Sequence, residues 1–362
     1  MKTNQEKFLL IYPDCILVNG YRKMLIMDMS RKNYYEISSS YYEILCDFRK
    51  EKISSILIKY ESEQENVNEL ISFLVNNDLA TYVDSISSFP EISTEYFTNR
   101  LIRDGIIEGN DQSDKNWLRS LIVAFNNVKC ESLEFVYYNK LEISDYDALF
   151  EMLLLTELKS IILVTHYNNK ISQLKYKQIL EKYPFICFLY LFGSDEYKSI
   201  SIRTEFGDIG NRKIVFSKQI INNHKDCGNI KIENFTLPKI EDITANKSCN
   251  SCLGNKLSID LSGKVKNCPS FKNNFGNVGS TPLSEIVNNE DFKLYTKITK
   301  DDIETCKDCQ YRYICKDCRA YIQDPKNIFS KPLKCGYDPY LDRWDNWREN
   351  PLNKDSIKYY EL

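Results

Sequence analysis

The first part of the chain carries the hydrophobic pattern of a short antiparallel sheet. Residues 15–19 and 23–29 alternate between apolar and polar side chains, as half-buried strands do, and residues 34–37 can form a third strand. Alternation places successive side chains on opposite faces of a sheet. One face of this sheet is therefore expected to pack on a core.

Helices are expected to follow these strands. Residues 40–43, Ser-Tyr-Tyr-Glu, have the form of a capping box, which opens a helix. Three short strands and three helices outline a winged-helix-like domain over residues 1–88, with a generic α+β domain as the alternative. The last of these helices is predicted to end near residues 76–78, and its apolar stripe consists of Val67, Leu70, Ile71 and Leu74.

A different order of predicted elements begins after a serine-rich linker over residues 85–98. Patterns of buried strands alternate with patterns of helices, which predicts a parallel sheet with right-handed crossovers. About 150 residues are too few for a complete eight-fold barrel, which takes about 250. The fold class is therefore α/β, and residues 89–225 are expected to form a partial (β/α) barrel or a small open sheet. The predicted strands cover residues 133–137, 161–165 and 185–191, and the predicted helices cover residues 146–155 and 171–180.

The composition changes at about residue 226. Cysteine, asparagine, lysine and glycine become more frequent, and long apolar runs disappear. A domain over residues 226–362 with so little apolar core needs another source of stability, which bound metal can supply. Only four of the thirteen cysteines precede this point, in apolar surroundings typical of core residues: Cys15, Cys46, Cys130 and Cys187.

Charge and hydropathy limit the partners and the cellular location that can be expected. The 362 residues are 43% hydrophobic and 27% charged, with a formal net charge of −3, so neither nucleic acid nor an anionic membrane surface is an expected partner. No run of about 18 apolar residues predicts a membrane helix, and the first residues lack the pattern of a signal peptide. A cytoplasmic location is expected. Because disulfides are uncommon there, the clustered cysteines indicate metal ligation.

The late cysteines occur largely in Cys-x2-Cys pairs. Such a turn directs two thiolates at one point, which suits both zinc and iron–sulfur clusters. The group consists of Cys249 and Cys252, Cys306 and Cys309, Cys315 and Cys318, and the single residues Cys227, Cys268 and Cys335.

Spacing separates the two kinds of metal. Only five residues lie between Cys309 and Cys315, whereas the two pairs of one zinc site are commonly separated by about 12 to 20 residues. The short spacing makes it easier for these thiols to bind two metal centres than to converge on one zinc ion. The eight cysteines from Cys249 to Cys335 then fill two four-cysteine sites, and two zinc sites of unusual spacing are the alternative.

These spacings resemble the signature of the SPASM domain. Cys252 is followed after ten residues by Gly263 and after four more by Cys268, which looks like the opening of that signature. Its second half looks like the x2, x5, x2 spacing of the cysteines in residues 306–318, followed by Cys335. The last of these gaps has two residues here, where the usual SPASM form has three.

The resemblance implies particular ligands, because SPASM domains hold two auxiliary four-iron four-sulfur clusters. The first cluster would take Cys249 or Cys252, together with Cys268 and Cys318. The second cluster would take Cys306, Cys309, Cys315 and Cys335.

A closer resemblance covers nearly the whole chain, to the SPASM-domain peptide maturases of grasp-with-spasm gene clusters. Such clusters also encode an ATP-grasp ligase and a short precursor peptide, and the resemblance implies both as partners. It also implies that residues 1–88 bind the leader segment of the precursor along an exposed strand edge. The similar runs are residues 226–228 (Asp-Cys-Gly), 256–260 (Lys-Leu-Ser-Ile-Asp), 266–270 (Lys-Asn-Cys-Pro-Ser), 311–315 (Tyr-Arg-Tyr-Ile-Cys) and 331–337 (Lys-Pro-Leu-Lys-Cys-Gly-Tyr).

One signature of radical S-adenosylmethionine enzymes is missing. These enzymes need Cys-x3-Cys-x2-Cys after the first barrel strand, here expected near residues 101–107, and the chain contains no such triplet. S-adenosylmethionine is therefore not expected as a cofactor. His166 follows a buried strand and His224 lies three residues before Cys227, so each histidine is a candidate functional residue. Cys227 itself can be an unligated thiol, a replacement ligand or a redox-active residue.

Three functions stay open on the sequence. The first is an iron–sulfur protein of the radical SAM-like class that takes part in maturing a ribosomally synthesised, post-translationally modified peptide, binding its leader beside an ATP-grasp ligase. The second is a redox enzyme that modifies the peptide through its auxiliary clusters. The third is a zinc-stabilised scaffold without redox chemistry. No catalytic residue is identified, so the sequence does not decide whether the chain is an enzyme.

Overall fold

The computed structural model describes residues 4–98, 100–109, 115–154, 156, 158–202 and 212–362. None of the helices in these ranges is long and apolar enough to span a membrane. The thirteen cysteines are present as thiols rather than disulfides.

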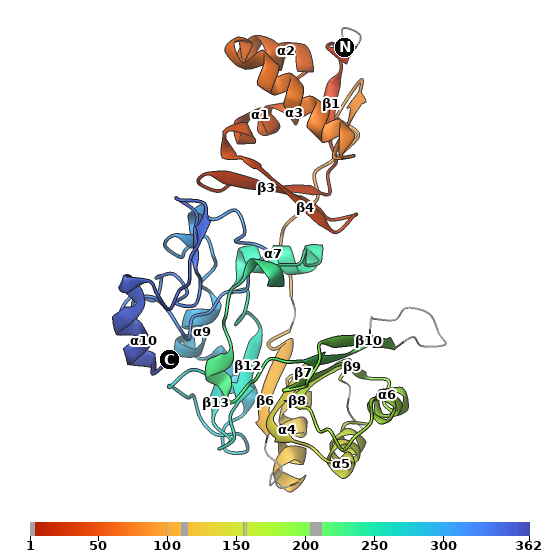
Figure 1. The fold of residues 1–362 in the computed structure, drawn as a ribbon, viewed down its shortest axis with the longest axis vertical. Helices are drawn as coiled ribbons and strands as arrows, with labels where there is room; N and C mark the ends of the chain where they lie inside the picture. Colours follow the sequence, from red (N-terminus) through yellow and green to blue (C-terminus); the bar gives the residue numbers. More distant parts are fainter. Residues whose placement is uncertain (1–3, 99, 110–114, 155, 157, 203–211) are drawn as a thin grey trace. The chain divides into compact units, whose positions relative to one another are not determined.

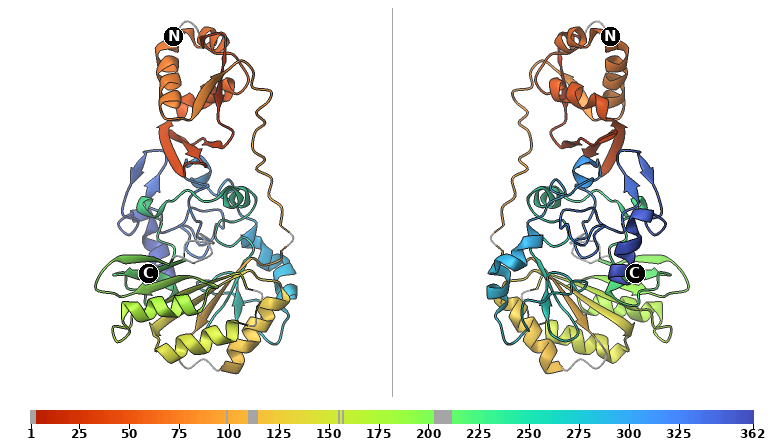
Figure 2. Two further views of the ribbon diagram at one scale, coloured as in Figure 1. Left: turned by 90° about the vertical axis from the view of Figure 1, so that its right-hand side faces the viewer. Right: turned by 90° about the vertical axis from the view of Figure 1, so that its left-hand side faces the viewer.

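Contacts between residues divide the chain into two units, and each is assembled from separate stretches (Figures 1 and 2). The stretch predicted to be cysteine-rich contributes to both units. The predicted domain boundaries at residues 88 and 225 stay a prediction. The first unit consists of residues 1–97, 230–251 and 298–361, and the second consists of residues 98–229, 252–297 and 362.

The second unit is built around an eight-stranded sheet in the order β10-β11-β9-β8-β7-β6-β12-β13. The six strands from β11 to β12 run parallel, and the edge strands β10 and β13 pair antiparallel. The bounds are β6 Asp104–Gly109, β7 Ser132–Lys140, β8 Ser160–His166, β9 Ile186–Phe192, β10 Lys198–Ile202, β11 Arg212–Ser217, β12 Lys256–Ile259 and β13 Val265–Lys266.

Three helices cover one face of this sheet, namely α4 Lys115–Asn127, α5 Ile143–Leu153 and α6 Gln173–Lys182 (Figure 1). Leu133 and Phe135 of β7 belong to the core beneath them and are fully buried. Because side chains alternate along a strand, Glu134 and Tyr138 of the same strand lie on the opposite face. The unit is completed by two short helices, α8 Leu283–Asn288 and α9 Glu290–Thr296.

The predicted α/β rhythm is confirmed in the second unit. The three predicted strands are β7, β8 and β9, the two predicted helices are α5 and α6, and the strand expected near residues 101–107 is β6. Residue 155, the predicted end of one helix, lies outside the described residues. The sheet also extends beyond the predicted boundary, because β12 pairs in parallel with β6.

The first unit contains the three predicted antiparallel strands, β2 Cys15–Val18, β3 Lys23–Asp28 and β4 Asn33–Ser38. The four residues of the predicted apolar stripe in α3 are all buried. The remaining elements of this stretch are α1 Tyr42–Phe48, α2 Ile53–Lys59, α3 Gln64–Asn76, and the antiparallel pair β1 Phe8–Ile11 and β5 Ala80–Val83.

The capping box predicted at residues 40–43 is wrong. A short 3-10 turn, Ser39–Tyr41, precedes α1, and the hydroxyl of Ser38 accepts a hydrogen bond from the amide of Ser40 at 3.3 Å. The N-cap of α1 is therefore Tyr41. The helix α1 begins one residue later than predicted, because the 3-10 turn capped by Ser38 precedes it.

The three-stranded sheet is apolar on both faces. Met24 and Ile26 face the helices α1 to α3, whereas Leu25 and Met27 share a second core with Tyr311 and other residues of the cysteine-bearing segment. Residues 298–361 therefore pack directly on the N-terminal strands within one unit. The further elements of this unit are α7 Ile240–Ser248, the 3-10 turn η6 Cys306–Asp308, β14 Tyr337–Asp338, β15 Arg343–Trp344 and α10 Lys354–Tyr360.

Truncation of Phe135 to alanine is expected to lower the free energy of unfolding by about 3–5 kcal/mol, since a fully buried aromatic side chain leaves a cavity. Urea denaturation followed by circular dichroism measures the change. Leu174→Ala is the control, because Leu174 is 65% exposed and should change stability little. Equal midpoints for the two variants would contradict the assigned core.

Candidate iron–sulfur centres

Four thiols of the first unit gather around the side chain of Lys300. The ammonium nitrogen of Lys300 lies 3.9 Å from the sulfur of Cys306 and 3.5 Å from the sulfur of Cys315. Cys309 interacts electrostatically with both of these cysteines and with Cys335. The structure therefore brings together the four residues that the resemblance assigned to one cluster. We call this group the Lys300 cysteine site.

Tight turns hold these thiols in place. The amide of Cys309 donates to the carbonyl of Cys306 at 3.0 Å, and the amide of Cys315 donates to the carbonyl of Tyr311 at 2.9 Å. The amide of Tyr311 also donates to the sulfur of Cys309. Amide–sulfur bonds of this kind stabilise negative charge on a thiolate and tune the potential of an iron–sulfur cluster.

Burial raises the pKa of Cys306, Cys309 and Cys315, so these thiols stay protonated in the absence of a metal. It raises the pKa of Cys315 to about 12 and raises the pKa of Cys309 well above its usual value. Lys300 opposes this effect, because its positive charge lowers the pKa of both Cys306 and Cys315. A metal must displace the protons to bind thiolates, and a cation beside the sulfurs favours that exchange.

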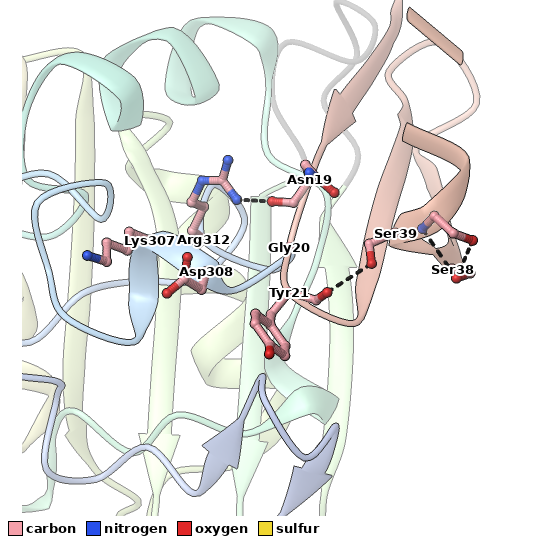
Figure 3. Close-up of a pocket in the computed structure, with 9 residues that line it drawn as sticks. Asn19, Gly20, Tyr21, Ser38, Ser39, Lys307, Asp308 and Arg312 are labelled. Carbon is pink, nitrogen blue, oxygen red and sulfur yellow. Dashed lines mark hydrogen bonds between the residues drawn. The ribbon is translucent and has the colours of Figure 1, made fainter. Parts of the chain in front are cut away.

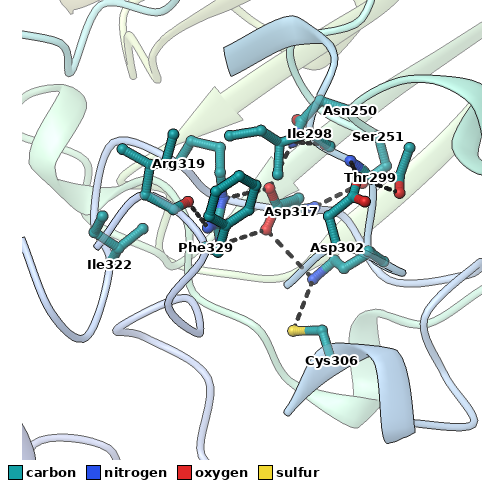
Figure 4. A network of polar contacts seen from close by, with 12 residues as sticks. Asn250, Ser251, Ile298, Thr299, Asp302, Cys306, Asp317, Arg319, Ile322 and Phe329 are labelled. Carbon is teal, nitrogen blue, oxygen red and sulfur yellow. Dashed lines mark hydrogen bonds and ion pairs between the residues drawn. The ribbon is translucent and has the colours of Figure 1, made fainter. Parts of the chain in front are cut away.

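A buried ionic network supports Lys300 (Figure 4). Its ammonium nitrogen lies 3.5 Å from a carboxylate oxygen of Asp317, and both side chains are almost fully buried. Arg319 donates to Asp317 at 2.9 Å, and the amide of Asn250 donates to the same carboxylate at 2.6 Å. Burial alone would raise the pKa of Asp317, but the two cations and these hydrogen bonds keep it below its usual value. The carboxylate therefore stays ionised.

The N-terminal sheet approaches the same cysteine segment through its β2–β3 turn. The amide of Tyr21 donates to the carbonyl of Asp308 at 2.8 Å, and the guanidinium of Arg312 donates to the carbonyl of Asn19 (Figure 3). A β-carbon on Gly20 would lie 2.7 Å from the amide nitrogen of Gln310, so only glycine permits this approach. The turn and η6 line an open pocket of about 520 Å³.

The second unit gathers Cys252 and Cys268 near Lys256 of β12. Burial alone would lower the pKa of this lysine, but electrostatic interactions with Cys252, Glu134, Asp104 and Cys268 raise it. Lys256 is therefore a cation held among two thiols and two carboxyl groups. The arrangement repeats the pairing of a lysine with cysteine sulfurs in the first unit.

Titratable side chains lie on the sheet face opposite the helices. The hydroxyl of Tyr138 donates to the buried carboxylate of Glu108 at 2.6 Å, and Nδ1 of His224 lies 3.6 Å from the same carboxylate. Burial is also the largest cause of the raised pKa of Glu134. The sequence could have revealed these residues, because Glu108 and Glu134 each lie within an otherwise apolar strand.

The remaining candidate site residues make contacts with nearby parts of the backbone or lie beside the ionic network. The sulfur of Cys249, at the end of α7, donates to the carbonyl of Ala245 at 3.3 Å. Cys318 is half-buried beside Asp317. Nδ1 of His166 lies 2.9 Å from the carbonyl of Tyr167, at the end of β8.

Comparison with known proteins points to the same kind of centre. Residues 249–310 match the family model of SPASM, an iron–sulfur cluster-binding domain. A SPASM iron–sulfur domain is present. The crystal structure of Streptococcus suis SuiB aligns with 91% of this chain and 98% of its own, at 8% identity and a TM-score of 0.34. No curated protein matches the chain.

The donor set fits SPASM clusters. Among the residues that the structure describes, no three histidine, cysteine or carboxylate side chains converge as they would around a single metal ion. The donor set consists of thiols, which are the ligands of iron–sulfur clusters. The matched residues 249–310 contain five of the eight predicted ligands: Cys249, Cys252, Cys268, Cys306 and Cys309.

Replacement of Lys300 by methionine is expected to lower the reduction potential of a cluster bound at the Lys300 cysteine site. The ammonium group stabilises the more negative, reduced cluster, so its loss should shift the potential down by about 59 mV, which corresponds to about 1.4 kcal/mol for one electron. Redox titration followed by electron paramagnetic resonance measures this shift. Lys326→Met is the control at an exposed lysine. Identical potentials in wild type and Lys300→Met would contradict the assigned contact.

Proposed function

We propose that this chain is an iron–sulfur protein that takes part in the maturation of a ribosomally synthesised, post-translationally modified peptide. The observation that carries the proposal is the gathering of four thiols around the buried Lys300, in a chain with a SPASM domain. In this proposal the chain binds the precursor leader and acts beside an ATP-grasp ligase, as its resemblance to grasp-with-spasm maturases implies.

The proposal assigns two four-iron four-sulfur clusters. When bound, such clusters supply one-electron transfer. In the first unit, the four thiols of the Lys300 cysteine site would hold one cluster, and Lys300 would offset its negative charge. The other cluster would take the remaining predicted ligands, namely Cys249 or Cys252, with Cys268 and Cys318.

The proposed fold of each unit also follows from the resemblance to these maturases. The parallel order of β11, β9, β8, β7, β6 and β12, with helices on one face, supports a partial (β/α) barrel of radical-SAM type. The three-stranded sheet with α1 to α3 supports a winged-helix-like domain for leader recognition.

The edge of β4 is the place proposed for the leader. In the described part of the chain, β4 pairs with β3 on one side and forms the edge of its sheet. An edge strand offers backbone amides and carbonyls to which an extended peptide can add as a further strand. Beside this edge, the half-buried rings of Tyr35 and Phe73 pack at 5.8 Å between centroids. They offer an apolar contact for the side chains of such a peptide.

Replacement of Tyr35 by alanine is expected to weaken binding of the precursor peptide. Loss of a central aromatic contact costs about 2 kcal/mol, which corresponds to a roughly thirtyfold rise in Kd. Fluorescence anisotropy with a labelled precursor measures Kd. Ile58→Ala on α2 is the control, since Ile58 is 76% exposed and lies away from β4. Unchanged affinity in Tyr35→Ala, with the fold intact by circular dichroism, would remove the proposed leader site.

A redox enzyme is the second candidate, and contacts at both groups of cysteines favour it. Lys300 contacts two cysteine sulfurs, an arrangement that tunes a cluster potential. In the second unit, the hydrogen-bonded pair of Tyr138 and Glu108 lies near Cys227 and Cys268. Incubation of the precursor with this protein and dithionite separates the candidates. A mass change that requires both components supports the enzyme, and an unchanged mass supports the binding protein.

A further inference from the structure

The segment of residues 224–228 lies against the predicted cluster ligands of the second unit. The carbonyl of His224 accepts one hydrogen bond from the amide of Cys227 at 3.2 Å and another from the hydroxyl of Ser270 at 3.2 Å. Ser270 follows Cys268 by two residues. A single carbonyl oxygen therefore ties the backbone at Cys227 to the turn that carries Cys268.

Electrostatic contacts complete a triangle of thiols. Cys227 interacts with Cys252, Lys256 interacts with Cys252 and Cys268, and Tyr138 interacts with Cys227 and Cys268. Each of the three cysteines is thus linked to the other two, directly or through a shared neighbour. All of these residues belong to the second unit.

The backbone after Cys227 is shaped to hold a thiolate. Gly228 has a φ of 83°, a left-handed conformation that favours glycine, and its amide donates to the sulfur of Cys227. The Tyr311 amide makes the same kind of bond to Cys309 in the Lys300 cysteine site. Lys256 places a positive charge near the three sulfurs, as Lys300 does in the first unit.

We propose that Cys227 is an iron ligand and binds, together with Cys252 and Cys268, the iron–sulfur cluster of the second unit. Three thiolates then bind three of the four irons, and each gives up its proton when it binds. This inference rests on the proposed iron–sulfur function and changes its ligand set, because it adds a cysteine that lies before the matched residues 249–310.

Alkylation of the wild-type chain tests the proposal without an amino-acid substitution. Cys227 is an exposed residue, but desolvation of its sulfur raises the pKa of the thiol. At alkaline pH, iodoacetamide should therefore label an unligated thiol there, whereas an iron-bound thiolate should be protected. Anaerobic protein is labelled with its metal and again after removal of the metal by a chelator, and peptide mass spectrometry reports the label on Cys227. Protection that disappears with the metal is expected. Equal labelling in both states would overturn the proposal.

Metal content of three variants provides the second measurement. Cys227→Ser is expected to lose about as much iron as Cys252→Ser, on the order of one four-iron cluster per chain. Cys187→Ser is the matched control in β9 and should keep the wild-type content. Iron in Cys227→Ser equal to that in Cys187→Ser would overturn the proposal. If the wild type holds zinc instead of iron, the iron–sulfur function fails, whereas metal-dependent protection of Cys227 still tests its role as a ligand.

Discussion

The buried ammonium group of Lys300 needs nearby negative charge, because an uncompensated ion inside a protein costs several kcal/mol. Asp317 supplies one carboxylate, but Arg319 shares it, so the network contains two cations and one anion. The thiols of Cys306 and Cys315 lie within 4 Å of the ammonium and become anions when metal replaces their protons. Metal binding therefore completes the charge balance on which this part of the first unit depends.

The same segment connects the cysteines to the N-terminal sheet. Leu25 and Met27 of β3 share a core with Tyr311 and Tyr337, which lie close to proposed ligand cysteines in the sequence. The opposite face of this sheet packs on the three helices beside β4. The proposed leader-binding strand and one proposed cluster thus belong to a single packed unit, so metal binding and peptide binding are expected to stabilise each other.

The resemblance to the SPASM signature predicted the four thiols that gather around Lys300, and hydrophobic periodicity predicted the parallel strands and α3. Lys300 and Asp317 could not be predicted, because a lysine and an aspartate in a polar segment look like surface residues until the fold buries them. The extension of the sheet by β12 was equally hidden, since four residues show too little periodicity to reveal a partner strand. The hydrogen bond from Ser270 to His224, which links the backbone at Cys227 to the turn of Cys268, is a tertiary contact that no local pattern contains.

The central claim is that the gathered thiols bind iron–sulfur clusters, and metal analysis of anaerobically purified protein tests it most directly. Two SPASM clusters predict about eight iron and eight sulfide per chain, with visible absorption that dithionite bleaches. Zinc without sulfide would contradict the account. It would make the cysteine segment a structural scaffold, with peptide binding as the remaining function.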